Sequence, residues 1–267
     1  SNFHEKQIPN NISYIDDNNV ELASRWTPLD SVGLYVPGGK ASYPSSVIMT
    51  AIPAKIAKVP EVSMCVPTPK GYLNPSVLVA AKICEVDNIY KIGGAQAIAA
   101  MAYGTDTIKK VNKIFGPGNA WVAEAKRQLF GKVGIDMVAG PSEILVISDD
   151  KSNPNWIATD LLSQAEHDAE SQSILITDNI EFAIKVERAV DILIESLERK
   201  DIAKASWSKN GIIIVLENLE HSIEIVYKIA PEHLEISTDN PELIAEKINN
   251  AGSIFLGRFV PEAIGDY

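Results

Sequence analysis

The length, composition and charge of the chain exclude several classes of protein. Its 267 residues are 46% hydrophobic and 22% charged, the composition of a globular protein with one large domain or two ordinary ones. The 24 Lys and Arg against 35 Asp and Glu give a formal net charge of -11, which repels a phosphate backbone, so we expect no nucleic-acid partner. No apolar run approaches the roughly 18 residues of a spanning helix, and we expect no membrane partner.

The N-terminal residues and the two cysteines indicate a cytoplasmic location. The first six residues have neither the basic nor the apolar region of a signal peptide and begin without Met, so they read as a processed end. Cys65 and Cys84 lie in apolar segments without C-x-x-C spacing. That placement is typical of buried thiols in a reducing compartment.

From about residue 32 onward, short β-branched runs alternate with segments of helical period, the pattern of parallel sheets covered by helices. The predicted strands are 32–36, 62–66, 89–92, 113–115, 134–138, 144–147, 173–177, 212–216, 234–237 and 253–256. The predicted helices are 43–58, 75–84, 95–103, 119–130, 154–169, 180–198, 219–229 and 241–249. We therefore predict an α/β fold in two halves with a seam near 139–142, preceded by an Asn- and Asp-rich arm of about thirty residues lying over the body.

The predicted helix over 154–169 carries polar residues beside its apolar stripe. Asp160, Gln164, His167 and Asp168 share one face, because residues three and four apart are neighbours on a helix. An amide oxygen and an imidazole are then within reach of one metal ion. Gln is not a usual zinc ligand, so this pattern by itself also fits a solvated face.

A second polar motif, Pro231-Glu232-His233, lies between a predicted helix and a predicted strand. Such turns often display reactive groups. His233 can take or give a proton near neutral pH, and the adjacent Glu232 can activate water or tune the imidazole. An ordinary turn is the alternative interpretation.

Four glycine-bearing turns end strands or begin helices, at 36–40, 92–95, 115–119 and 139–142. Backbone N–H groups at helix starts suit phosphates or carboxylates. The segment 33–40 misses the P-loop spacing by one residue, with Ala41 where Ser or Thr should bind magnesium, and 93–95 is not G-x-G-x-x-G. Motif rules alone predict neither a kinase nor a dinucleotide enzyme, and ordinary turns remain an alternative.

Taken together, these segments resemble the histidinol dehydrogenase family over nearly the whole chain. The matching stretches are GLYVPGGK from Gly33, GGAQAIAAMAYGT from Gly93, FGPGNAWVAEAKRQLFG from Phe115, DMVAGPSEILVISD from Asp136, DLLSQAEHDAESQ from Asp160, APEHLEI from Ala230, and AGSIFLG from Ala251 through the final GDY. The resemblance implies a cytoplasmic homodimer built from two incomplete Rossmann-like domains. It also implies oxidation of L-histidinol to L-histidine through histidinaldehyde, with two NAD and one zinc per active site.

The resemblance assigns roles to individual residues and domains. It implies an NAD-contacting domain over 35–142 and a discontinuous zinc and substrate domain formed by 1–34 with 143–267. By matching motif, the implied NAD contacts are Tyr35, Gln96 and Asn119. The implied zinc ligands are Gln164, His167 and Asp266, and these three also contact the substrate, as do Ser142 and His233. The implied acid/base pair is Glu232 and His233.

The implied chemistry suits these residue types. Zinc would orient the substrate by its imidazole and amino nitrogens rather than act as a Lewis acid. His233 would take the alcohol proton as hydride leaves, and Glu232 would deprotonate the water that hydrates the aldehyde before the second hydride transfer.

Family members are longer at both ends, and their C-terminal tail supplies a histidine as fourth zinc ligand and a glutamate near the substrate from the partner subunit. We therefore expect this chain to fold but to bind zinc poorly and to turn over slowly or not at all. One alternative is a truncated homologue that binds NAD or a small ligand without turnover. Another is a zinc-dependent hydrolase or a dehydrogenase of another amino alcohol, since Glu232 with a metal-bound water could cleave an amide or ester.

Overall fold

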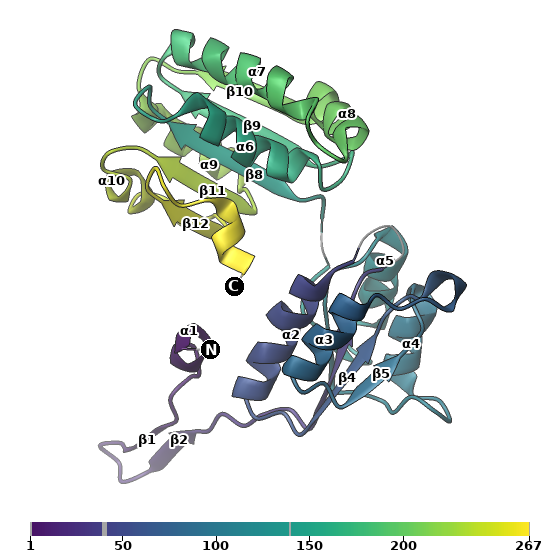
Figure 1. The fold of residues 1–267 in the computed structure, drawn as a ribbon. Helices are drawn as coiled ribbons and strands as arrows, with labels where there is room; N and C mark the ends of the chain where they lie inside the picture. Colours follow the sequence, from purple (N-terminus) through teal and green to yellow (C-terminus); the bar gives the residue numbers. More distant parts are fainter. Residues whose placement is uncertain (1, 39–41, 139, 267) are drawn as a thin grey trace. The chain divides into compact units, whose positions relative to one another are not determined.

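The computed structural model describes residues 2–38, 42–138 and 140–266, with the side chain of Asp266 outside the described part. Its contacts divide the chain into two compact units, unit 1 (Ser1–Ala139) and unit 2 (Gly140–Tyr267). Each unit contains a five-stranded parallel sheet with helices on both faces (Figure 1). The predicted α/β class is confirmed.

The sheet of unit 1 has the strand order β5-β4-β3-β6-β7, and every neighbouring pair is parallel. Its strands are β3 (Ser31–Tyr35), β4 (Glu61–Cys65), β5 (Asn88–Tyr90), β6 (Lys113–Phe115) and β7 (Gly134–Ile135). Counted along the chain within the unit, this is the order 3-2-1-4-5 of the dinucleotide-binding fold without its sixth strand. The predicted incomplete Rossmann-like unit is therefore confirmed here.

Side-chain alternation along the strands of unit 1 divides its core in two. Val32 and Leu34 face α2 (Pro44–Ile56) and α3 (Pro75–Ile83), whereas Tyr35 faces α4 (Ala95–Tyr103) and α5 (Ala120–Leu129). The short 3-10 helix η1 (Pro69–Gly71) precedes α3. Both cysteines are buried and free, as predicted, and burial raises the pKa of Cys65 to about 12.

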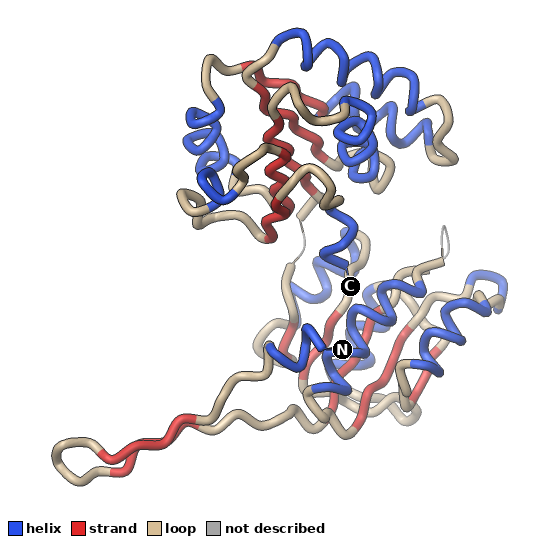
Figure 2. The backbone as a smooth tube through the Cα atoms, turned by 60° about the vertical axis from the view of Figure 1, so that its left-hand side comes forward, coloured by secondary structure: helices blue, strands red, loops and turns tan. Residues whose placement is uncertain are grey.

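Unit 2 repeats this topology with the strand order β10-β9-β8-β11-β12, again parallel throughout. Its strands are β8 (Glu143–Ser148), β9 (Gln172–Thr177), β10 (Gly211–Val215), β11 (His233–Ser237) and β12 (Ser253–Leu256). Its helices are α6 (Pro154–Ala165), α7 (Ile180–Ile194), α8 (Lys200–Asn210), α9 (Ser222–Ile229) and α10 (Glu242–Ala245), with the 3-10 helices η2 (Leu219–His221) and η3 (Glu262–Asp266). The core places α6, α7 and α8 on one face and α9 and α10 on the other (Figure 2).

Some predicted boundaries differ from the structure. The predicted helix 154–169 ends as α6 at Ala165, because Glu166 and His167 turn the chain toward β9. The predicted helix 241–249 shortens to α10, and α8 was not predicted because only Ala203 and Ser206 of it are buried, which leaves little apolar periodicity.

The N-terminal arm contains α1 (Asn2–Lys6) and an antiparallel hairpin of β1 (Ile12–Ile15) and β2 (Glu21–Ser24). Every residue of β1 and β2 is exposed. Neither strand was predicted, because their sequences do not alternate between apolar and polar residues over enough positions.

The boundary between the units falls within the predicted seam at 139–142. The discontinuous second domain was predicted to include 1–34, but Ser31 to Leu34 pair with β4 inside the sheet of unit 1. Among the described residues, every helix is too short or too polar to cross a membrane.

Candidate functional site

Tyr35, the first predicted NAD contact, ends β3 at the carboxyl edge of the unit 1 sheet. Its hydroxyl accepts a hydrogen bond from Gly94 N–H at 2.9 Å, and the side chain is 4% exposed. Burial raises the pKa of Tyr35 against the opposing effect of that hydrogen bond, so the hydroxyl stays protonated. Gly94 has φ 75 and precedes α4, whose second residue, Gln96, is exposed. The tyrosine therefore fixes the turn that presents Gln96.

Asn119, the third predicted NAD contact, is the N-cap of α5 after β6. Its side-chain oxygen accepts a hydrogen bond from Val122 N–H at 3.2 Å, and the residue is exposed. In the same turn Gly116 has φ +118, and a Cβ there would lie 2.1 Å from the carbonyl oxygen of Tyr35. The structure thus gathers Tyr35, Gln96 and Asn119 at one edge, where parallel sheets of this order bind ligands.

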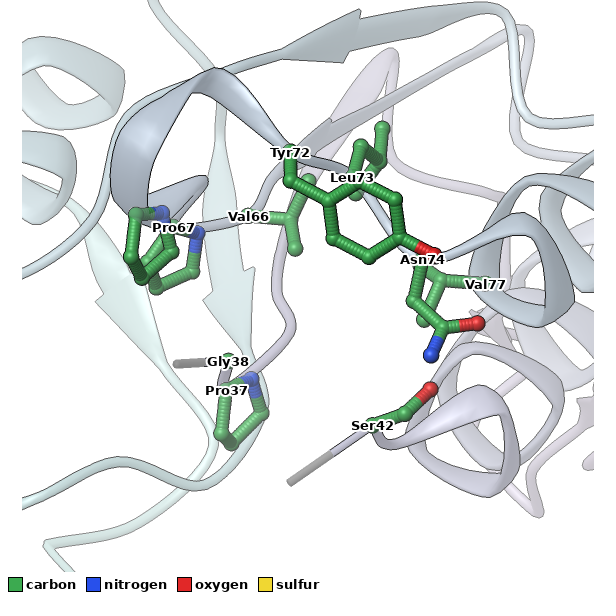
Figure 3. A pocket seen from close by; sticks show the side chains of 10 residues that line it. Pro37, Gly38, Ser42, Val66, Pro67, Tyr72, Leu73, Asn74 and Val77 are labelled. Carbon is green, nitrogen blue, oxygen red and sulfur yellow. The ribbon is translucent and has the colours of Figure 1, made fainter. Parts of the chain in front are cut away.

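A cavity of about 280 Å³ opens at this edge of unit 1, between the ends of β3 and β4 and the start of α3 (Figure 3). Asn74 caps α3 by accepting a hydrogen bond from Ser76 N–H at 2.9 Å, and Ser76 Oγ lies 3.0 Å from Ser42 Oγ. The cavity is lined by Pro37, Gly38, Ser42, Val66, Pro67, Pro69, Tyr72, Leu73, Asn74 and Val77. Its apolar walls with a few polar groups suit a small organic ligand. Of the predicted glycine turn 36–40, Gly39 and Lys40 lie outside the described residues.

In unit 2 the predicted residues gather at the opposite, amino edge of the sheet. His233 begins β11, and its Nδ1 lies 3.4 Å from Gln164 Oε1 on α6, 69 residues away in sequence. Gln164 is 5% exposed, so it is not on the solvated face that was the alternative prediction. His167 instead lies beyond the end of α6 and is exposed. The predicted shared helical face of Gln164 and His167 is therefore wrong, because the helix ends between them.

Glu232 and Ser142 lie at the same amino edge. Glu232 is exposed, and its Oε2 accepts a hydrogen bond from Glu143 N–H at 3.2 Å, directly after Ser142. Burial raises the pKa of Glu143, and the nearby charge of Glu232 raises it further. Ser142 is half-buried, and its carbonyl accepts a hydrogen bond from Gln172 N–H at 3.0 Å. A carboxylate open to water thus lies at the same edge of the sheet as the imidazole of His233.

Three acidic residues beside His233 were not predicted as site residues. Glu235 is 2% exposed, and burial, followed by the charge of Asp160, raises its pKa to about 9. Burial and then Glu262 raise the pKa of Asp160 to about 6, and Glu262 Oε1 lies 3.4 Å from His233 Nδ1. A sequence signal existed for Glu235: it interrupts an apolar strand two residues after His233, on the same face.

The described residues contain no group of three or more His, Cys, Asp or Glu side chains suited to a metal ion. Of the predicted zinc ligands, Gln164 offers an amide oxygen that faces His233, His167 offers an exposed imidazole, and the side chain of Asp266 lies outside the described part. The described donors fit a zinc ion only in part, so the metal site stays a prediction.

The sequence model of histidinol dehydrogenase matches residues 1–267. Histidinol dehydrogenase 1 of Nostoc sp. is 57% identical over 267 residues, covering 100% of this chain and 62% of the relative. Histidinol dehydrogenase of Rhodospirillum rubrum is 59% identical over 266 residues, covering 99% of this chain and 61% of the relative.

The crystal structure of histidinol dehydrogenase from Elizabethkingia anophelis matches with a TM-score of 0.96 at 42% identity, covering 100% of this chain and 62% of that one. This chain therefore spans about 62% of the length of the proteins it matches. The match of the family model over the whole chain, together with these identities, shows that the chain belongs to the histidinol dehydrogenase family.

Proposed function

We propose that this chain carries the residues for the NAD-dependent oxidation of L-histidinol to L-histidine through histidinaldehyde, the reaction that ends histidine biosynthesis. The observation that carries the proposal is that His233, 3.4 Å from Gln164, and the exposed Glu232 lie at the same amino edge of unit 2. A water-accessible carboxylate and an imidazole at one edge supply the two proton acceptors that an alcohol oxidation followed by aldehyde hydration needs. Family membership supports the substrate assignment.

The proposal assigns NAD to unit 1, where Tyr35, Gln96 and Asn119 lie at one edge of the sheet. The starts of α4 and α5 point backbone N–H groups toward that edge, and such helix starts attract phosphate groups. The cavity beside Asn74 and Tyr72 adds apolar walls at the same edge. NAD would accept hydride from the substrate in each of the two oxidation steps.

His233 is the proposed acceptor of the alcohol proton. Two oxygens, Gln164 Oε1 and Glu262 Oε1, each lie 3.4 Å from its Nδ1. Because both are hydrogen-bond acceptors, they select, in the neutral ring, the tautomer that carries its hydrogen on Nδ1. Nε2 then holds the lone pair that takes the proton.

Glu232 is the proposed base for the second step. Its carboxylate is exposed and is oriented by the hydrogen bond from Glu143 N–H at 3.2 Å. A carboxylate reached by water can remove a proton from the water that adds to histidinaldehyde. The hydrated aldehyde is then a substrate for a second hydride transfer.

Zinc remains part of the proposal, held by Gln164, His167 and Asp266. When bound, it would orient the substrate through ligation of its nitrogens. The proton transfers assigned to His233 and Glu232 do not pass through the metal. A cytoplasmic homodimer is also proposed, in keeping with the two buried free cysteines and the family resemblance.

The test uses a chimera of this chain with a longer member of the family. The matching segment of the Rhodospirillum rubrum relative is replaced by these residues, and NADH formation is measured with L-histidinol, NAD and zinc. We expect NADH formation by the chimera, and a loss of about 10²- to 10⁴-fold in kcat on His233→Asn. His221→Asn, an exposed histidine before α9, is the matched control and should leave kcat unchanged.

The other interpretations give different results in the same assay. A hydrolase would cleave an ester or amide substrate without forming NADH, and a binding-only homologue would bind NAD without turnover. An inactive chimera beside an active Rhodospirillum rubrum enzyme would contradict the proposal.

A further inference from the structure

Unit 1 contains a buried lysine that no proposed chemical step uses. Lys126 lies on α5 and is 3% exposed. Its side chain reaches back toward the start of the helix, as helical side chains do, and Nζ donates a hydrogen bond to the carbonyl of Gly116 at 2.9 Å. Nζ also forms an ion pair with Asp136, which follows β7.

Asp136 binds the other polar group of the same glycine. Its Oδ2 accepts a hydrogen bond from Gly116 N–H at 2.8 Å, and its Oδ1 accepts one from Met137 N–H at 2.7 Å. The amide and the carbonyl of Gly116 are thus both held by one ion pair whose members come from two other segments. The result is a closed ring of contacts through Gly116, Asp136 and Lys126.

This ring of contacts holds a turn in which Gly116 lies very close to the backbone of Tyr35. Gly116 has φ +118, and a Cβ at this residue would lie 2.1 Å from the carbonyl oxygen of Tyr35. The turn therefore packs backbone to backbone against Tyr35, and three residues later it ends at the exposed N-cap Asn119. Any shift of Gly116 therefore moves Asn119 relative to Tyr35, two of the three proposed NAD contacts.

A charged pair at this place is not explained by stability alone. Desolvation of buried charges offsets much of their attraction, so an apolar pair of similar volume commonly stabilises a fold as well. An apolar pair cannot, however, bind the N–H and the C=O of Gly116 together. We propose that Lys126 and Asp136 are positioning residues of the cofactor site, which hold the turn Phe115 to Asn119 in the geometry that binds NAD. This inference rests on the proposed NAD site of unit 1.

The test measures NAD binding to the 267-residue chain by isothermal titration calorimetry, for the parent and for Lys126→Met. Lys126→Met keeps the length of the side chain and removes both polar contacts. We expect its dissociation constant for NAD to rise about tenfold or more, because a small displacement of a preorganised site is costly. Lys132→Met, at an exposed position of unit 1, is the matched control and should bind as the parent does.

Two further readouts separate positioning from folding. Circular dichroism and the thermal midpoint establish that each variant is folded. In the chimera with the Rhodospirillum rubrum relative, Lys126→Met should raise KM for NAD while kcat and the KM for histidinol stay at parent values. If Lys126→Met does not fold, Asp136→Asn, which keeps the side-chain shape, decides the question with an expected loss of about threefold or more.

The outcomes distinguish this inference from the proposal beneath it. A folded Lys126→Met or Asp136→Asn variant that binds NAD as tightly as the parent would overturn the inference alone. A parent chain that binds no NAD would overturn the cofactor site, and the inference with it.

Discussion

The two units share one strand order and use opposite edges of it. In unit 1 the carboxyl edge is open, with glycine turns that present Gln96 and Asn119. In unit 2 Arg258 bridges the loops at the same edge, and the titratable residues His233 and Glu232 lie at the amino edge instead. The strand order alone therefore does not tell where a ligand binds, because the side chains at each edge decide it.

Arg258 bridges the loops at the carboxyl edge of unit 2. Its guanidinium donates two hydrogen bonds of 2.6 Å to Asp149 and one of 2.8 Å to Asp239. It also donates to Ser152 Oγ at 2.6 Å and to the carbonyl of Ser237 at 3.1 Å. These contacts raise the pKa of Arg258, the bond to Asp149 most of all, and they occupy the switch point where a nucleotide would bind in such a sheet.

Removing this bridge should have the largest effect on stability. Arg258→Met removes both hydrogen bonds to the carboxylate of Asp149 and leaves Asp239 paired with Lys151, and the arginine side chain is only 13% exposed. We expect the free energy of unfolding of unit 2 to fall by about 3–5 kcal/mol, measured by urea denaturation.

Arg127→Met is the matched control, because Arg127 pairs with Glu124 on the surface with 62% and 45% side-chain exposure. Its cost should stay below about 1 kcal/mol. Equal effects at the two arginines would show that Arg258 does not hold the carboxyl edge of unit 2 together.

At the open edge of unit 1 the requirement is for glycine. Gly116→Ala brings a Cβ to 2.1 Å from the Tyr35 carbonyl oxygen at φ +118, so we expect a loss of roughly 2–4 kcal/mol in the stability of unit 1.

Two other glycines separate the causes of that loss. Gly131 has φ +93 with nothing within 4 Å of an added Cβ, so Gly131→Ala should cost about 1 kcal/mol from backbone strain alone. Gly140 also has open space and no positive φ, and Gly140→Ala should change stability by less than about 0.5 kcal/mol. The loss of stability of the three variants is measured by thermal and urea unfolding. If Gly116→Ala is not the most destabilising of them, the turn at Gly116 can shift to make room for the added Cβ.

The buried acidic residues Glu235 and Asp160 should have a smaller effect on the stability of unit 2, and this effect depends on pH. The pKa of Glu235 is raised to about 9 from 4.5, so the folded unit keeps a proton that the unfolded chain releases. Stability is then fully present below the unfolded pKa and falls as pH rises toward the folded pKa. Asp160, with a pKa of about 6, acts in the same direction over a narrower range.

Glu235→Gln keeps the shape of the side chain and cannot ionise. From about pH 6 to about pH 9 the free energy of unfolding should fall in both proteins. We expect the fall in Glu235→Gln to be smaller than in the parent by more than about 1 kcal/mol, since one pKa unit corresponds to about 1.4 kcal/mol. Glu124→Gln is the control, because hydrogen bonds from Arg127 and Gln128 lower the pKa of that carboxyl to about 2, outside this range. A parent and a Glu235→Gln variant with the same pH slope would show that Glu235 is already ionised in the fold.

Most strands were predictable because a buried parallel strand needs a continuous apolar run. The predicted strands 144–147 and 173–177 lie within β8 and β9, each buried at five of its six residues. Helix ends were less predictable, because α6 ends where the chain must turn into β9 although its apolar pattern continues to Ala169. The exposed hairpin of β1 and β2 gave no usable pattern, since no face of it is buried.

By itself, the sequence determined the α/β class and the two halves, because strand and helix periods and glycine turns are local properties. The family resemblance, and not those periods, pointed to Tyr35, Gln96 and Asn119. Only the tertiary structure decided that Gln164 meets His233 while His167 lies apart, and that Glu235 and Asp160 share a buried site. Those contacts depend on the register of β11 against β8, in which His233 pairs with Ile144, and on how α6 packs across that sheet. Register and packing join residues far apart in sequence, so no local pattern contains them.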